Sequence, residues 1–347
     1  MLSGLRSDDG VHFGNRTNLL ELPSPPWREV MFTHNLAVLP LGRDEYAMIG
    51  GLQGFVSNVT CRKELRMSRV LAPIQHHAAC LQLDRREPND GSMDTAPSNG
   101  IRLSRGRGLP WSSSKWTMPH TIITGDSPSG CVDRRPYYTG FPRLQACQFD
   151  GRLALTRAVN GGFLLYARAN LRFGAVSGGR FVQVSQSASL ERGWAAWQPV
   201  HILGVDPQSM DVYFFSVQAN PVHSGSLLAL FPLTEPPFAC IAFAISIDGI
   251  RFSRPATLRQ SLLGVRQSER GSGLAEATLE WRGEDHPVAG VVRSPTNPAQ
   301  LLVYLHHAVK GTTIRANATP HVRVYQVTTA EILRYTSKGL QELQLDA

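Results

Sequence analysis

Residues 147–202 read CQFDGRLALTRAVNGGFLLYARANLRFGAVSGGRFVQVSQSASLERGWAAWQPVHI. Four runs of apolar or alternating residues are separated there by glycine-rich or polar segments: 152–159, 163–170, 180–187 and 194–202. Asn160, Gly161 and Gly162 supply the positive-φ positions that a tight hairpin turn needs. Short strands at this spacing are typical of all-β proteins. The stretch therefore predicts one four-stranded antiparallel sheet.

Three further parts of the chain repeat this plan, fully or in part: 34–53, 211–258 and 285–329. A lone four-stranded meander cannot bury both of its faces, so each unit needs neighbours of its own kind. Similar four-stranded units in series are typical of a β-propeller. The sequence predicts a single domain over residues 1–347, an all-β, five-bladed β-propeller of four-stranded antiparallel blades.

A short element, Ser-x-Asp-Gly-[Val/Ile]-x-Phe, occurs at residues 7–13 and again at 246–252. Its Asp-Gly pair fits a tight turn that leads into the outer strand of a blade. Residues 1–22 are therefore expected to be the end of a blade. Two alternatives are open: the C-terminal strands complete that blade and close the ring, or its inner strands lie upstream of residue 1.

Two segments are expected to be long loops, 61–99 and 126–147, because they are polar or rich in Arg, Tyr and Pro. Such loops on one face of a ring can build a binding surface. Helix signals are nearly absent, and a single helical turn is expected at 330–335.

The amino-acid composition argues against some classes of binding partner. The net charge of +8 is carried by scattered arginines that do not alternate with aromatic residues, which argues against a nucleic-acid groove. Two alternatives are open for this charge: the arginines lie on a solvated surface, or they attract an anionic polysaccharide. No apolar run approaches the roughly 18 residues of a membrane-spanning helix. The first ten residues contain no apolar segment of a signal peptide.

The cysteines show no metal-binding spacing: Cys61, Cys80, Cys131, Cys147 and Cys240. Two alternatives are open for them: two disulfides with Cys240 buried and free, or five reduced thiols. Three sequons permit N-glycosylation: Asn15, Asn58 and Asn317. Together these features predict a glycoprotein that is secreted or lumenal.

The first strand of each propeller blade lines the central channel, so residues just before those strands share one funnel. Acidic residues and a histidine occupy these positions, and they are the candidate catalytic residues: Asp150, Asp285, Asp211 and His34. Carboxylates gathered in one cavity have pKa values that are pushed apart, which can make one an acid and another a base or nucleophile. Glycosidases need such a pair. The alternative is that an aspartate caps a turn or pairs with Arg152.

Candidate substrate-binding residues lie around the same funnel: Asn35, Arg152, Arg168, His286 and His307. Arg168 on an inward-facing strand position can bind a carboxylate or a sulfate. For His286 and His307 the alternative is an ordinary core or turn histidine.

The pattern resembles the five-bladed β-propeller glycosidases of the arabinanase/xylosidase, invertase/levansucrase and mannoside-phosphorylase groups. The resemblance covers residues 30–335 as architecture. It rests on four short motifs: HNLAVLP at 34–40, FDGRLAL at 149–155, the two Ser-x-Asp-Gly elements, and DHPVAGVV at 285–292. It implies that Asp150 is the second-blade aspartate, which in such enzymes raises the pKa of an acid or stabilises the transition state.

The chain differs from those families in the acidic residues at its predicted channel positions. His34-Asn35 stands where most of them have Asn-Asp-Pro or Asp-Pro, and no Glu occupies the general-acid position, for which Asp211 is nearest. The resemblance therefore implies a glycoside-hydrolase-like protein, or a non-catalytic carbohydrate-binding or scaffold propeller. The expected partner is an oligo- or polysaccharide. No cofactor is required, and a structural metal ion in the central channel would fit His and Asp ligands.

Overall fold

The computed structural model describes residues 2–20, 36–51, 100–107, 116–117, 119–124, 149, 152–170, 180–235, 238–257, 286–307 and 321–346. The two segments expected to be long loops, 61–99 and 126–147, lie outside the described residues.

Two four-stranded antiparallel sheets follow each other along the chain. The first contains β3 (Ala37–Pro40), β4 (Glu45–Gly51), β5 (Gly100–Arg107) and β6 (His120–Thr124). The second contains β7 (Ala154–Arg157), β8 (Phe163–Asn170), β9 (Arg180–Ser187) and β10 (Gln198–Pro199). Their strands pair in sequence order, which is the meander predicted for each unit.

The later part of the chain forms two more sheets. One contains β12 (Asp211–Val212), β13 (Ser216–Ala219), β14 (Leu227–Glu235), β15 (Phe238–Ser246) and β17 (Ala256–Thr257). The other contains β18 (His286–Arg293), β19 (Gln300–His307) and β20 (His321–Thr328). Two short pairs complete the described strands: β1 (Leu2–Arg6) with β2 (Gly14–Leu20), and β11 (His201–Ile202) with β16 (Arg251–Phe252).

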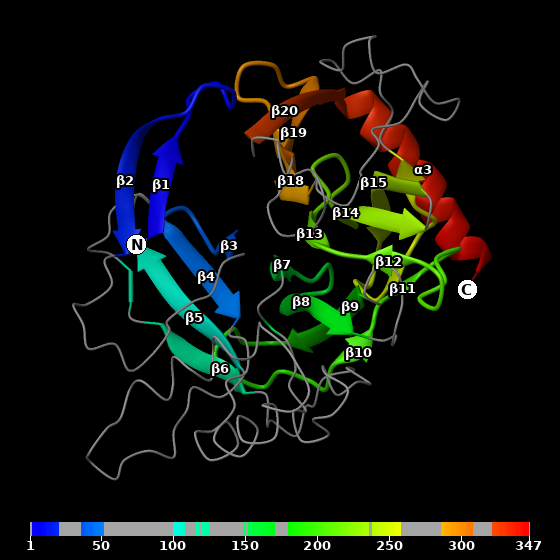
Figure 1. The fold of residues 1–347 in the computed structure, drawn as a ribbon, viewed down its shortest axis with the longest axis horizontal. Coiled ribbons are helices and arrows are strands. Elements are labelled where there is room, and N and C mark those ends of the chain that lie inside the picture. The colour runs from blue at the N-terminus through cyan, green and yellow to red at the C-terminus, as the bar shows by residue number, and fades with distance from the viewer. Residues whose placement is uncertain are drawn as a thin grey trace, which may run out of the picture.

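The sheets stand around a common centre like the blades of a propeller (Figure 1). Inner strands of successive blades lie side by side, β3 beside β7, β7 beside β13 and β13 beside β18. The predicted all-β, propeller-like fold is confirmed. The prediction of five four-stranded blades is wrong, because the described residues form four blades of three to five strands and β1–β2 is only a two-stranded hairpin.

The Ser-x-Asp-Gly element forms the same turn at both of its positions. Asp9 Oδ1 accepts hydrogen bonds from the Val11 and His12 amides, and Asp248 Oδ1 accepts them from the Ile250 and Arg251 amides, all at 2.8 Å. Each turn also meets a tyrosine of a neighbouring blade: the Tyr304 hydroxyl donates to the Gly10 carbonyl at 2.7 Å, and the Tyr166 hydroxyl to the Gly249 carbonyl at 2.8 Å. The first of these contacts places the N-terminal hairpin against β19.

Aromatic side chains fill the space between the second and third blades. Tyr166 of β8 contacts Phe215 and Phe252, and Phe215 also contacts Phe231 of β14, with ring centroids 5.0–6.3 Å apart. All four side chains are almost fully buried. Burial of such large apolar surfaces is the dominant favourable contribution to folding.

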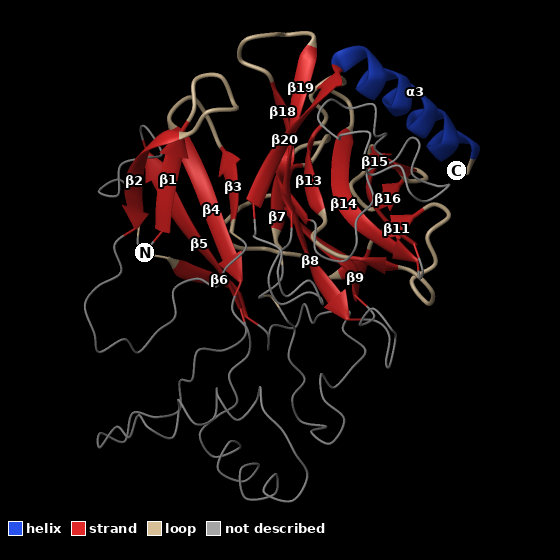
Figure 2. Ribbon diagram, turned by 45° about the horizontal axis from the view of Figure 1, so that its top comes forward, coloured by secondary structure: helices blue, strands red, loops and turns tan. Residues whose placement is uncertain are grey.

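The C-terminal segment forms a longer helix than expected. Instead of one turn at 330–335, α3 covers Thr329–Leu345. Its buried residues, Ile332, Thr336, Gly339 and Leu343, share one helical face, but only two of them are large and apolar, so the sequence hides the periodicity. The helix lies along the outside of β15, β16 and β20 (Figure 2). Among the described residues, no helix is long and apolar enough to cross a membrane.

Cys240 is a free, half-buried thiol, and burial raises its pKa. The other four cysteines lie outside the described residues, so both alternatives for their pairing stay open.

A charged cluster joins the first two blades. Glu191, just after β9, accepts hydrogen bonds from Arg105 Nε of β5 at 2.6 Å and from His120 Nε2 of β6 at 2.7 Å. Partial burial alone would raise the pKa of Glu191, but the hydrogen bonds to Arg105 and His120 outweigh this and bring the pKa below its ordinary value of 4.5.

Replacement of this glutamate should change how stability depends on pH. A carboxyl with a depressed folded-state pKa stabilises the fold above its unfolded-state pKa, and this contribution is lost as the pH falls. Solvent screens these half-exposed groups, so Glu191→Gln should lower the free energy of unfolding by less than about 1 kcal/mol at pH 7. Urea denaturation at pH 7 and below pH 4.5 should show the difference shrinking with acid. Asp44→Asn, in an exposed turn, is the control; a difference that grows with acid would contradict the assignment.

Candidate functional site

The inner strands that surround the channel are tied together across blades. Gln218 of β13 donates from Nε2 to the Val291 carbonyl at 2.7 Å and accepts from the Val291 amide at 2.6 Å, so its side chain pairs with β18 as a backbone strand would. A Cβ atom at Gly290 would occupy the position of the Gln218 carboxamide. This link fixes β18, which begins with His286, relative to the third blade.

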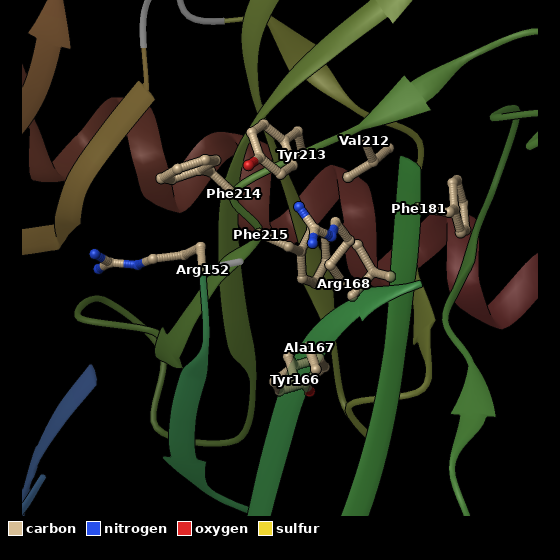
Figure 3. Close-up of a pocket in the computed structure, with 10 residues that line it drawn as sticks. Arg152, Tyr166, Ala167, Arg168, Phe181, Val212, Tyr213, Phe214 and Phe215 are labelled. Carbon is tan, nitrogen blue, oxygen red and sulfur yellow. The ribbon is translucent and has the colours of Figure 1, made fainter. Parts of the chain in front are cut away.

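A small pocket, partly open to solvent and with room for about one water molecule, lies between the second and third blades. Arginine, aromatic and small apolar side chains line it (Figure 3). They come from the start of the second blade, from β8 and β9, and from the segment 212–215: Arg152, Tyr166, Ala167, Arg168, Phe181, Val182, Val212, Tyr213, Phe214 and Phe215. No acidic residue is among these described lining residues.

The segment after β12 presents two aromatic rings at this pocket. Phe214 has φ of 53°, the one positive φ at a residue other than glycine within the described ranges. A bulky residue in this conformation is strained, and such strain is concentrated at functional sites. The Phe214 ring stacks on the His286 ring at 3.9 Å with an interplanar angle of 12°, and Tyr213 meets both rings edge-on. The strained backbone thus joins the pocket to the start of β18.

Two arginines are held on the Tyr213 ring. The guanidinium carbon of Arg180 lies 4.6 Å from the ring centroid, and that of Arg168 lies 5.9 Å from it. Figure 3 shows the Arg168 side chain rising from β8 toward Tyr213. The Arg168 backbone is fixed by Gln183, whose Nε2 donates to its carbonyl at 2.8 Å. Cation–π contacts of this kind help to orient an arginine side chain.

Arg152 lies at the start of the second blade, and its guanidinium extends beneath Phe214, away from Arg168 (Figure 3). Its Nε atom is buried and has no hydrogen-bond partner among the described residues. Loss of solvation lowers the pKa of Arg152 to about 10, so the side chain remains charged at neutral pH. No acidic side chain of the described lining compensates the charge of Arg152.

The structure brings several predicted site residues to this region. Arg152 and Arg168 line the pocket, and His286, only 2% exposed, stacks on the lining residue Phe214. Asp211, 4% exposed, directly precedes the lining segment and pairs in register with Thr234 of β14. His307 lies elsewhere, with its Nε2 2.9 Å from the Tyr325 hydroxyl and its ring stacked on His321.

The remaining predicted site residues lie outside the described residues: Asp150, Asp285, His34 and Asn35. Their catalytic and binding roles stay predictions.

Sequence reasoning missed two residues that line the pocket, Tyr213 and Phe214, and a third, Arg180, that lies over the Tyr213 ring. A signal was available for the two aromatic residues, because the run Tyr213-Phe214-Phe215 directly follows Asp211 at the expected channel position. Successive side chains of a regular strand point to opposite faces of the sheet, so three aromatic residues in a row cannot all be buried on one face. Such a run therefore indicates an irregular backbone. Nothing in the local sequence indicated that Arg180 would reach Tyr213.

The structural metal ion expected in the channel stays a prediction. Among the described residues, no group of three or more His, Cys, Asp or Glu side chains is arranged to hold one.

Comparison with known proteins gives only distant likenesses. No family model matches the sequence, and no curated protein matches it significantly. Among solved structures, the chain is similar to the α-L-arabinofuranosidase Arb93A from Fusarium graminearum, with 10% identity, coverage of 95% of this chain and 86% of that chain, and a TM-score of 0.46. It is also similar to Zg3597, a family 117 glycoside hydrolase from Zobellia galactanivorans, with 10% identity, coverage of 94% and 72%, and a TM-score of 0.44.

The GH43 protein BlXynB from Bacillus licheniformis is another similar structure, with 11% identity, coverage of 86% of this chain and a TM-score of 0.43. The chain spans 40% of the length of BlXynB and 64% of another matched glycoside hydrolase. The solved structures named here are glycoside hydrolases, the class that the sequence motifs resemble. At these identities and TM-scores the likeness assigns no activity to this chain.

Proposed function

We propose that this protein is a glycan-active propeller that takes its ligand in the central channel, at the pocket between the second and third blades. The observation that carries the proposal is the strained Tyr213-Phe214 segment, which presents aromatic faces between the arginines of the pocket and the buried His286. Apolar and aromatic walls with a few convergent polar groups are typical of small-molecule sites. The propeller-like fold and the sequence motifs support a sugar as the ligand.

Hydrolysis of a glycosidic bond would use Asp150 and Asp285 as the carboxyl pair, with Asp211 or His34 assisting. Two carboxyl groups are needed because one protonates the leaving oxygen while the other acts as nucleophile or base. Asp211 supports this reaction by its burial beside the pocket-lining segment.

Binding without hydrolysis is the second candidate. It is favoured by one observation: the described lining of the pocket contains arginine and aromatic side chains but no carboxylate. Such a site recognises a ligand without supplying an acid or a base. The binding would then be lectin-like.

A glycan-panel assay that measures hydrolysis and binding together separates the two candidates. If hydrolysis is the function, Asp150→Asn and Asp285→Asn should each lower turnover by about 100-fold or more and retain binding, because asparagine keeps the shape but cannot transfer the proton. Asp44→Asn, in the exposed turn after β3, should leave turnover unchanged. Binding without turnover in the unmodified protein would establish the second candidate, and no response to any glycan would contradict both.

A further inference from the structure

The charge of Arg152 points to what the channel ligand must carry. Among the described residues no carboxylate lies in the pocket lining, and the buried Nε of Arg152 has no hydrogen-bond partner. Removing a charged group from water is costly unless another group compensates it. Departures from this rule in a folded protein are concentrated at functional sites.

A second arginine, Arg168, also lines this pocket. The guanidinium groups of Arg168 and Arg180 both lie over the ring of the lining residue Tyr213. A cleft with low-dielectric walls and charges of one sign concentrates ligands of the opposite sign. The aromatic rings of Tyr213 and Phe214 provide that apolar wall.

The guanidinium of Arg152 also has the geometry to bind an anion. Its planar fork offers parallel N–H donors that match the two oxygens of a carboxylate or of a sulfate ester. Because the pKa of Arg152 remains at about 10, its guanidinium is a cation at neutral pH, where carboxylates and sulfate esters are anions.

We propose that the channel pocket recognises an anionic sugar, a uronic acid or a sulfated sugar, and that Arg152 binds its carboxylate or sulfate while the Tyr213-Phe214 segment contacts the sugar ring. This inference rests on the proposed glycan function of the same channel and names the class of its ligand.

Matched pairs of ligands test the inference without any mutation. Calorimetry would compare oligogalacturonate with its methyl-esterified form, and a sulfated galactan oligosaccharide with its desulfated form. In each pair the sugar is retained and the charge is removed. At least one charged form should bind about tenfold or more tightly than its neutral counterpart, and added NaCl should weaken that preference. The pair that responds identifies carboxylate or sulfate as the anion.

Arg152→Gln should then remove the preference. It should weaken binding of the charged form by about 10- to 100-fold, because the charge-assisted hydrogen bonds are lost, and should weaken binding of the neutral form far less. Arg152→Lys should restore only part of the affinity, since it keeps the charge but lacks the fork. The control, Arg43→Gln, removes the same charge from an exposed turn and should behave as the unmodified protein does.

The outcomes separate this inference from the function on which it rests. Equal binding of charged and neutral forms would overturn the anion assignment and leave the glycan function intact, even if Arg152→Gln did not fold. Unchanged binding of the charged form by Arg152→Gln would overturn the role of Arg152. Failure of every charged and neutral form to bind would overturn the anion assignment for these sugars, whereas the glycan function itself would be contradicted by the absence of any response across the glycan panel.

Discussion

Gly249→Ala should lower the free energy of unfolding by about 3–5 kcal/mol, the sum of backbone strain and overpacking. Gly249 has φ of +79°, and a Cβ atom there would lie 2.3 Å from Leu164 Cδ1 and 2.7 Å from the Tyr166 hydroxyl. The turn of the third blade would have to withdraw from the second, which would also break the hydrogen bond from Tyr166 to the Gly249 carbonyl. Urea denaturation followed by fluorescence would measure the change.

Gly161→Ala separates the two causes. Gly161 also has a positive φ, of +99°, but nothing lies within 4 Å of a Cβ atom there. This variant should therefore lose only about 1 kcal/mol, from backbone strain. Equal losses in the two variants would show that the contact between the turn and Tyr166 contributes nothing beyond backbone conformation.

Gly51→Ala should destabilise the protein by more than about 3 kcal/mol or prevent folding, because the space beside it is filled by backbone. A Cβ atom at Gly51 would lie 1.6 Å from the carbonyl oxygen of Phe149, and a main-chain atom cannot move aside as a flexible side chain can. Phe149 is itself anchored, with 1% of its surface exposed and its ring 5.5 Å from that of Trp197. The first blade would have to separate from the start of the second.

The control for this variant is Gly42→Ala, because nothing lies within 4 Å of a Cβ atom at Gly42. It should change the free energy of unfolding by less than about 0.5 kcal/mol. Soluble expression and the thermal unfolding midpoint would compare the two variants with the unmodified protein. A Gly51→Ala midpoint equal to that of Gly42→Ala would show that the two blades do not approach as closely as the structure places them.

Much of the fold follows from local signals in the sequence. The second blade was predicted strand by strand, because alternation and turn residues are read over a few positions: 163–170 and 180–187 are the bounds of β8 and β9. The helix was underestimated, although Thr328 and Glu331 carry a capping signal, with the Thr328 hydroxyl accepting from the Glu331 amide. Blade size was also misjudged, because the number of strands in a sheet depends on pairing between distant segments.

The sequence predicted the location of several candidate site residues, and their roles stay predictions. Arg152, Arg168, Asp211 and His286 were expected at the channel because they precede or occupy strands of blades, and the structure places all four in or next to the pocket region. Arg152, Asp211 and His286 follow from the rule that inner strands line the channel, which needs only the order of the strands. Arg168 lies on β8, the second strand of its blade, and was expected there because its strand position faces inward.

By itself, the sequence determined most of the strands, their tight turns and the repeated Ser-x-Asp-Gly element. These features depend on residues a few positions apart. Only the tertiary structure decided that Phe214 takes a left-handed conformation against His286, that Arg180 reaches Tyr213, and that Arg152 has no acidic neighbour in the described lining. Such contacts join blades that are distant in sequence, so they are fixed by the register and packing of whole sheets rather than by local residue preferences.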